Sequence, residues 1–290
     1  MCTRHLFSVL GIASLLLSAC GDDGGGEECT CPAASVQTIG HRGSGDSSEE
    51  NPLPENTLPS VLAAMENGAD GVEIDIQLSA DGVLVLMHDA EVDGTTDGTG
   101  CVNALTVEEL KALDAGHPGA IGEGYTIPTF AEVLAAFDGG LLDVELKVET
   151  GHAACEDTDR EATVAALLAD LEGFPRERLV VSSFDAEILS MVREADPTIR
   201  LALIAVGAGS IEIAGTAGFD AVALLWATVG PSDIADAHAR GLDFWVWTLD
   251  DEADAERLID LGIDGVITND VPTILALRER MCEDSACPLR

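Results

Sequence analysis

Positive charge is scarce in this chain of 290 residues, which has 53 aspartate and glutamate residues but only 14 lysine and arginine residues. The formal net charge is -39 at pH 7. Proteins bind nucleic acid through clustered cationic side chains, so this charge balance excludes an extended nucleic-acid interface. We interpret most of the acidic residues as a solvated surface.

The N-terminus lacks an apolar segment long enough for a stable membrane span. Its apolar run, "LFSVLGIASLLLSAC", is short and ends in small residues, which is typical of a secretory signal over residues 1–20. The last four residues of this run, 17–20, resemble the lipobox of bacterial lipoproteins, whose cysteine is acylated, here Cys20. We therefore predict an exported protein that meets the membrane only through a lipid on Cys20, on the periplasmic or cell-surface side of a bacterial envelope. The alternative is an ordinary signal peptide with a chance cysteine.

The chain also lacks a Cys-x-x-Cys pair and clustered histidines, which argues against a zinc site. Residues 21–35 begin with a glycine-rich, acidic stretch and predict a flexible tether. Outside the signal the cysteines are even in number, and in an exported chain this predicts disulfides. The candidates are Cys29, Cys31, Cys101, Cys155, Cys282 and Cys287.

From residue 36 onward, short apolar runs alternate with amphipathic helical patterns. This alternation favours a parallel sheet covered by helices. The helical patterns lie at 57–69, 160–173, 185–195, 231–242, 252–263 and 272–281, with a short one near 106–116. The nine strand candidates lie at 36–41, 71–78, 83–89, 141–148, 178–184, 199–206, 219–226, 242–249 and 264–269.

The strand at 83–89 follows its predecessor too closely for a crossover helix. Asp81-Gly82 is a two-residue hairpin signal, so we expect an antiparallel return with Asp75 opposite His88.

The other eight strands predict an α/β fold, a (β/α)₈ barrel of the TIM type over residues 36–281. Residues 91–126 are predicted to form a small insertion at the barrel mouth, and residues 282–290 a C-terminal tail.

Polar residues gather where the predicted strands end, which is where barrel enzymes carry their active groups. Three carboxylates converging there are costly unless positive charge lies between them, and oxygen-only ligands favour one Ca²⁺ or Mg²⁺ ion. Two histidines could then act as general acid and base on a bound phosphodiester. The alternative is a structural cluster of ion pairs. The residues are His41, Arg42, Glu73, Asp75, His88, Glu145 and Lys147.

Nine motifs occur in the order seen in the glycerophosphodiester phosphodiesterase family, and the chain resembles that family over residues 38–272. The resemblance implies a TIM barrel that uses Ca²⁺ or Mg²⁺ to hydrolyse small-molecule glycerophosphodiesters to glycerol 3-phosphate and an alcohol. One departure is a longer and more acidic loop between the first two motifs. The motifs are "GHRG", "PENT", "GADGVEIDIQLSADGVLVLMHD", "TTDGTGCVNALTVEELKALDAG", "IPTF", "VELK", "SSFD", "VWTLD" and "GIDGVITND".

Each site residue takes its expected role from the motif that it matches. Trp247, at the end of a strand, is predicted to line the substrate pocket, with barrel core as the alternative. The resemblance implies catalysis by His41 and His88, a metal held by Glu73, Asp75 and Glu145, phosphate binding by Arg42 and Lys147, and support of the mouth by Glu55 and Asn56.

Two other functions are possible for a barrel of this kind. A lipid phosphodiesterase of the phospholipase D or sphingomyelinase D type would need an apolar, membrane-facing rim, and the acidic loops offer little of one. A non-catalytic surface binding protein would have no need for two acid/base histidines. The sequence predicts no particular oligomeric state or alcohol group.

Barrel topology also predicts how the cysteines meet. The first two candidates precede the first strand and the last two follow the final helix, so these four should gather at the bottom of the barrel. We predict two bridges between the termini, with their pairing open. Cys101 and Cys155 both lie in loops after strands, at the opposite end, and are predicted to pair with each other.

Overall fold

A barrel is the central element of the computed structural model, which describes residues 31–48 and 51–284. Its strands are β1 (Gln37–Gly40), β2 (Gly71–Leu78), β3 (Leu84–Leu86), β4 (Leu141–Leu146), β5 (Leu179–Ser183), β6 (Arg200–Ala205), β7 (Ala221–Leu225), β8 (Asp243–Trp247) and β9 (Gly265–Thr268). Eight of them run parallel in the order β1-β9-β8-β7-β6-β5-β4-β2, and the pairing of β1 with β2 closes the ring. The predicted TIM-type barrel is therefore confirmed.

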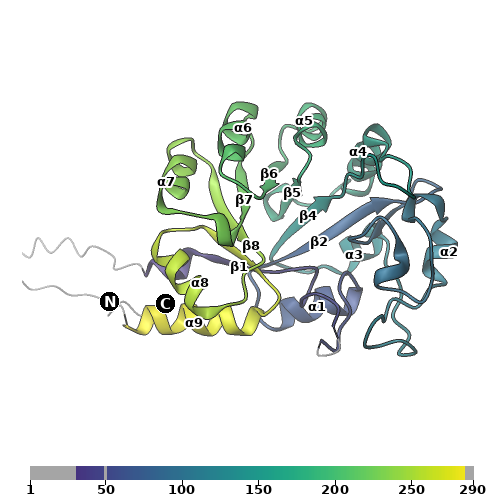
Figure 1. Ribbon diagram of the computed structural model, residues 1–290, viewed down its shortest axis with the longest axis horizontal. Coiled ribbons are helices and arrows are strands. Elements are labelled where there is room, and N and C mark those ends of the chain that lie inside the picture. The colour runs from purple at the N-terminus through teal and green to yellow at the C-terminus, as the bar shows by residue number, and fades with distance from the viewer. Residues whose placement is uncertain (1–30, 49–50, 285–290) are drawn as a thin grey trace, which may run out of the picture. The chain divides into compact units, whose positions relative to one another are not determined.

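Helices follow the strands and cover the outside of the barrel, and Figure 1 shows three of them, α4 to α6, side by side. The helices are α1 (Leu58–Glu66), α2 (Val107–Lys111), α3 (Phe130–Ala136), α4 (Arg160–Asp170), α5 (Ala186–Ala195), α6 (Gly209–Ala217), α7 (Pro231–Ala239), α8 (Glu252–Asp260) and α9 (Val271–Asp284). Helices α3 and α6 could not be predicted from the sequence. The first is only seven residues long, and the second is rich in small residues that carry little helical periodicity.

Some acidic residues begin helices instead of only facing solvent. Asp159, Asp185 and Asp251 each accept a hydrogen bond from the backbone of the first turn of α4, α5 and α8. Caps of this kind satisfy amides that would otherwise lack a partner, and each stabilises its helix by about 1 kcal/mol. The interpretation of the acidic residues as solvated surface is therefore incomplete at these positions.

The hairpin register differs from the prediction by one residue. The backbone amide of Met87 donates to the carbonyl of Asp75 at 3.1 Å, so Met87 lies opposite Asp75 in place of His88. The loop spans three residues, 80–82, because Gly82 adopts a left-handed φ of +81° that closes a longer turn. A shift of one residue reverses the face of each paired side chain.

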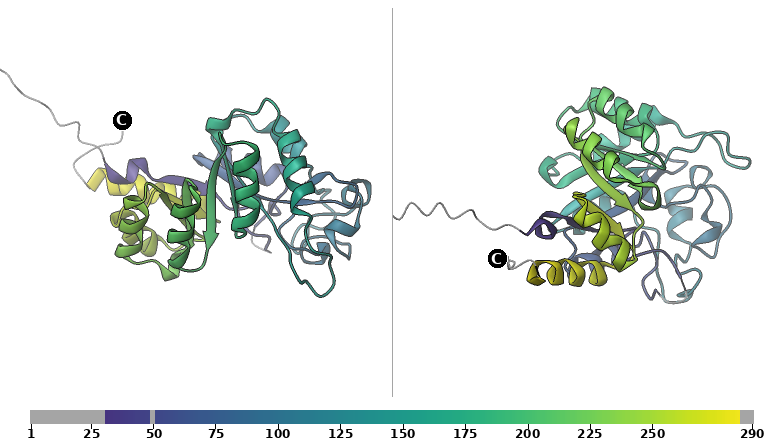
Figure 2. Two further views of the ribbon diagram at one scale, coloured as in Figure 1. Left: turned by 90° about the horizontal axis from the view of Figure 1, so that it is seen from above. Right: turned by 60° about the vertical axis from the view of Figure 1, so that its left-hand side comes forward.

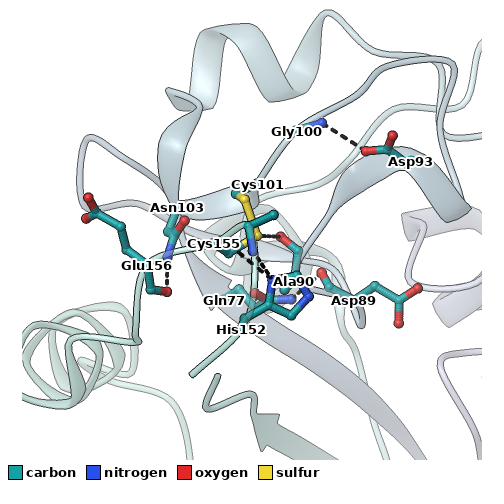
Figure 3. The surroundings of a disulfide bond; sticks show 11 residues. Gln77, Asp89, Ala90, Asp93, Gly100, Cys101, Asn103, His152, Cys155 and Glu156 are labelled. Carbon is teal, nitrogen blue, oxygen red and sulfur yellow. Dashed lines mark hydrogen bonds between the residues drawn. A yellow bond between two sulfur atoms is a disulfide. The ribbon is translucent and has the colours of Figure 1, made fainter. Parts of the chain in front are cut away.

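The insertion of residues 91–126 is fastened to the loop between β4 and α4. Cys101 and Cys155 form a disulfide with their Cα atoms 5.5 Å apart, which confirms the predicted pairing. Beside it, the Asn103 side chain donates to the Glu156 carbonyl at 2.8 Å, as Figure 3 shows. The chain that follows the end of β4 is thereby held against the insertion.

The first and last described segments lie side by side, as Figure 2 shows for the purple start and the yellow α9. Cys31 and Cys282 form a disulfide with their Cα atoms 5.4 Å apart. Arg278 of α9 also donates to the Ala33 carbonyl at 3.0 Å. One of the two predicted bridges between the termini is therefore confirmed.

Other predictions fall outside the described residues. They concern the second terminal bridge through Cys29 and Cys287, lipidation of Cys20, the signal over residues 1–20 and most of the tether. Among residues 31–48 and 51–284, none of the helices combines the length and the apolar character needed to cross a membrane.

Candidate active site

Two neighbouring strands carry an acidic centre inside the barrel. In the parallel register of β2 and β4, Asp75 lies opposite Glu145 and Glu73 lies opposite Asp143. Residues two apart on a strand share a face, so all four side chains point to the same side of the sheet. Carboxylate oxygens of Glu73, Asp75 and Glu145 lie within 4.8 Å of one another. The structure thus brings together the three predicted metal ligands.

Burial sets the protonation of these carboxylates. Glu73 is 3% exposed and Asp75 only 1%. Burial, reinforced by the charges of Asp75 and Glu145, raises the pKa of Glu73 well above its ordinary value. Burial also opposes ionisation of Asp75, but cationic neighbours, Lys147 first among them, outweigh it and lower the pKa of Asp75 to about 2. Burial therefore favours the protonated form of Glu73, while Asp75 stays ionised.

Two cationic side chains flank the acidic centre. Lys147 Nζ lies 2.7 Å from Glu145 Oε1 and 3.5 Å from Asp75 Oδ1. Arg42 Nε lies 3.5 Å from Asp75 Oδ2, and its Nη1 lies 2.8 Å from Glu55 Oε1. Burial works against both cations, but the nearby carboxylates outweigh it and raise the pKa of Arg42 and of Lys147. Both side chains stay charged at neutral pH.

The loop after β1 holds its residues in a strained backbone conformation. Arg42 has φ +50° and Asn56 has φ +53°, a left-handed region that costs energy for residues other than glycine. Two contacts fix this geometry. The Arg42 amide donates to Glu73 Oε2 at 2.8 Å, and the Asn56 side chain donates to Asp75 Oδ2 at 2.8 Å. The predicted supporting residues Glu55 and Asn56 thus contact the arginine and the acidic centre directly.

The two predicted catalytic histidines line the same pocket as Glu73 and Glu145. His88 reaches it despite the shifted hairpin register because β3 ends before it and the following turn is held separately. The Gln77 side chain donates to the carbonyl of His88 at 3.2 Å and to that of the next residue at 2.7 Å. The other predicted catalytic histidine, His41, comes directly after β1.

The pocket has a volume of about 340 Å³, and aromatic side chains form part of its lining beside the charged groups. Phe184 and Trp247 both line it and meet edge to face, with ring centroids 5.4 Å apart. The indole of Trp247 donates to the Ala223 carbonyl at 3.0 Å, which fixes the orientation of the ring. Trp247 therefore lines the pocket, as the sequence predicts.

The acidic centre fits a cation. Within the described part of the chain, Glu73 Oε1 and Asp75 Oδ1 are buried and have no hydrogen-bond partner. Buried polar atoms are nearly always satisfied, and although Lys147 Nζ lies 3.5 Å from Asp75 Oδ1, neither oxygen accepts a hydrogen bond, so both are open to a cation. Their oxygen chemistry suits Ca²⁺ or Mg²⁺.

Several residues of the site were not predicted from the sequence. Asp143 and Gln77 continue the inward alternation of β4 and β2, and that spacing could have revealed them. Asp46 and Asn269 contact His41, while Asp89 contacts His88 at 2.7 Å. These three lie in loops, where side-chain direction depends on contacts distant in the sequence.

Fold and pocket together define a TIM-barrel enzyme whose active groups sit at the C-terminal ends of the strands. Residues 41–273 match the model of the glycerophosphoryl diester phosphodiesterase family. The chain belongs to this family, whose members hydrolyse glycerophosphodiesters.

Individual relatives agree with this assignment. A glycerophosphodiester phosphodiesterase of Caldanaerobacter subterraneus subsp. tengcongensis is 34% identical over 243 residues, covering 82% of this chain and 96% of the relative. A solved Oleispira antarctica phosphodiesterase in complex with the product sn-glycerol-3-phosphate is 30% identical with a TM-score of 0.74, covering 83% and 96%. The Thermotoga maritima glycerophosphodiester phosphodiesterase is 26% identical with a TM-score of 0.66, covering 83% and 98%. The family and the enzyme class predicted from the motifs are confirmed.

The buried carboxyl of Asp143 predicts a pH-dependent stability. Burial raises the pKa of Asp143 from 3.8 to about 7. The Ser182 hydroxyl opposes this shift, because it donates a hydrogen bond to the Asp143 carboxyl at 2.7 Å. A raised folded-state pKa contributes stability that is present below pH 3.8 and is lost as the pH rises through 7. In the metal-free protein, the free energy of unfolding of Asp143→Asn relative to that of the wild type should therefore rise by about 4 kcal/mol between pH 4 and pH 8.

Urea unfolding of both proteins across this pH range measures the difference. The exposed Asp236→Asn variant on α7 serves as the control, and its curve should stay parallel to the wild type. A difference between Asp143→Asn and the wild type that does not change with pH would contradict the protonation described above.

Proposed function

We propose that the enzyme hydrolyses glycerophosphodiesters with one divalent cation, Ca²⁺ or Mg²⁺, and a pair of histidines. The observation that carries this proposal is the buried carboxylate cluster, whose oxygens lie within 4.8 Å of one another. Glu73, Asp75 and Glu145 would hold the cation. When bound, the ion would neutralise the carboxylates and polarise the phosphoryl group of the substrate.

Arg42 and Lys147 would bind the phosphate. They flank the carboxylate cluster, and their charge-assisted hydrogen bonds suit an anionic phosphodiester. Arg42 pairs with Glu55 at 2.8 Å, and Lys147 pairs with Glu145 at 2.7 Å. These contacts orient the two cations before the substrate arrives.

His41 and His88 would move the protons. In the hydrolysis, a water oxygen forms a bond to phosphorus and the bond from phosphorus to the alcohol oxygen breaks. One histidine takes a proton from the water, and the other gives a proton to the departing alcohol oxygen. The products are glycerol 3-phosphate and an alcohol. Trp247 and Phe184 would contact the carbon atoms of the substrate across the pocket.

Removal of metal tests the role of the carboxylates. A chelator should abolish the release of glycerol 3-phosphate from glycerophosphodiesters, and added Ca²⁺ or Mg²⁺ should restore it. Glu145→Gln should lose affinity for the cation yet remain folded, because the amide keeps the shape of the side chain. Glu256→Gln, on the exposed side of α8, is the matched control. Full activity of a demonstrably metal-free protein would refute the proposed site.

Substitution of the histidines tests the proton transfers. His41→Ala and His88→Ala should each lower kcat by about 10²-fold or more, because each removes a general acid or base. Binding of substrate, measured with the metal present, should weaken much less. His238→Ala on α7, away from the pocket, should keep wild-type turnover. If His41→Ala or His88→Ala also kept wild-type turnover, that histidine would have only a structural role.

We also propose that the enzyme works outside the cytoplasm, anchored through Cys20. The two disulfides among the described residues support an oxidising compartment. In a bacterial host, the wild type should fractionate with membranes and Cys20→Ser should not, because the acyl chains are lost. Wild-type protein found in the cytosol with free thiols would contradict the proposal.

A further inference from the structure

The loop after the first strand turns an acidic side chain back onto His41. Asp46 Oδ1 lies 3.1 Å from His41 Nδ1 and 3.6 Å from Arg42 Nη1. Asp46 belongs to the acidic loop between the first two motifs, "GHRG" and "PENT". Its side chain is 48% exposed and lines the pocket, whereas that of His41 is 13% exposed.

A side-chain network around Asn269 fixes the orientation of the imidazole. The Asn269 amide nitrogen donates to Asp46 Oδ2 at 3.2 Å and to Asp250 Oδ2 at 3.0 Å. Its oxygen therefore faces His41 Nδ1, at 2.8 Å. An amide oxygen and a carboxylate can only accept, so Nδ1 of His41 must carry a proton. In the neutral imidazole the free lone pair is then on Nε2.

The backbone keeps Asp46 in this place. Gly45 has φ +111°, and a Cβ atom there would lie 2.9 Å from the Asn269 carbonyl oxygen, so only glycine allows the loop to pack this closely. The Asp46 amide donates to the Asn269 side-chain oxygen at 3.1 Å. From the other side, the Asn51 amide group donates to the carbonyls of Gly45 and Asp46 at 3.1 Å and 3.0 Å.

The charge of Asp46 is also maintained. The hydrogen bond to His41 lowers the pKa of Asp46, and it outweighs the opposing effect of burial. The second histidine has a comparable partner, since His88 Nδ1 lies 2.7 Å from Asp89 Oδ1. Both histidines thus meet a carboxylate at Nδ1, although the two partners come from unrelated loops.

We infer that Asp46 is a positioning residue for hydrolysis that acts through His41, holding its ring and its Nδ1 proton so that Nε2 faces the substrate. This role rests on the proposed function of His41 as an acid/base group. Asp46 does not contact the reacting atoms itself. Because Asn269 shares the Nδ1 proton, loss of the Asp46 charge weakens the positioning but does not abolish it.

A double-mutant cycle on the full-length protein with metal present tests this inference. Asp46→Asn should lower kcat by about tenfold with little change in KM, which is less than the loss seen when a catalytic histidine loses its sole carboxylate partner. In the His41→Ala background, the same substitution should have no further effect on kcat, because the residue through which Asp46 acts is gone. Asp236→Asn removes the same charge at a distance and should change neither constant.

The outcomes separate the inference from the function on which it rests. If His41→Ala keeps wild-type turnover, the proposed function fails and the inference fails with it. If His41→Ala is impaired but Asp46→Asn matches the wild type, only the inference is refuted. Equal losses from Asp46→Asn in both backgrounds would also refute it, since the aspartate would then act through Arg42 or the loop. Thermal unfolding of each variant confirms that it is folded.

Discussion

The site depends on bringing three carboxylates together where water hardly reaches them. Glu73, Asp75 and Glu145 meet because the parallel register of β2 and β4 aligns their inward positions. Burying unpaired carboxylates costs several kcal/mol each, so the surrounding structure must supply positive charge. Arg42 and Lys147 supply part of it, and the strained backbone at Arg42 is held by a hydrogen bond to this cluster. The orphaned oxygens that remain are where a cation would complete the balance.

The same arrangement explains how a very acidic protein can act on an anion. Its net charge of -39 repels phosphodiesters at long range. At physiological ionic strength, however, charges farther than about 8 Å from the substrate are largely screened. Under the proposed function, Arg42 and Lys147 would act at contact distance from the phosphate in a partly buried site, where screening is weaker. Local cations would therefore decide binding in the proposed function, while several of the other acids cap helices.

Much of the fold and of the site could be predicted from the sequence, for identifiable reasons. Apolar strand runs and two pairs of charged residues spaced two apart, Glu73 with Asp75 and Glu145 with Lys147, predicted the barrel and its ligand cluster, and barrel topology alone placed Cys101 beside Cys155. The hairpin register was wrong because Asp-Gly does not distinguish a two-residue from a three-residue loop. Asp46 could not be predicted, because its direction depends on Asn269, a contact distant in the sequence.

Calorimetric titration of the metal-free protein with Ca²⁺ or Mg²⁺ tests the central claim most directly. In two buffers of different ionisation enthalpy, the heats should report one ion bound per chain and release of a proton, because the cation displaces the proton that the raised pKa of Glu73 retains. Glu73→Gln should remove the proton release. Absence of binding in the wild type, or binding without proton release, would contradict the account.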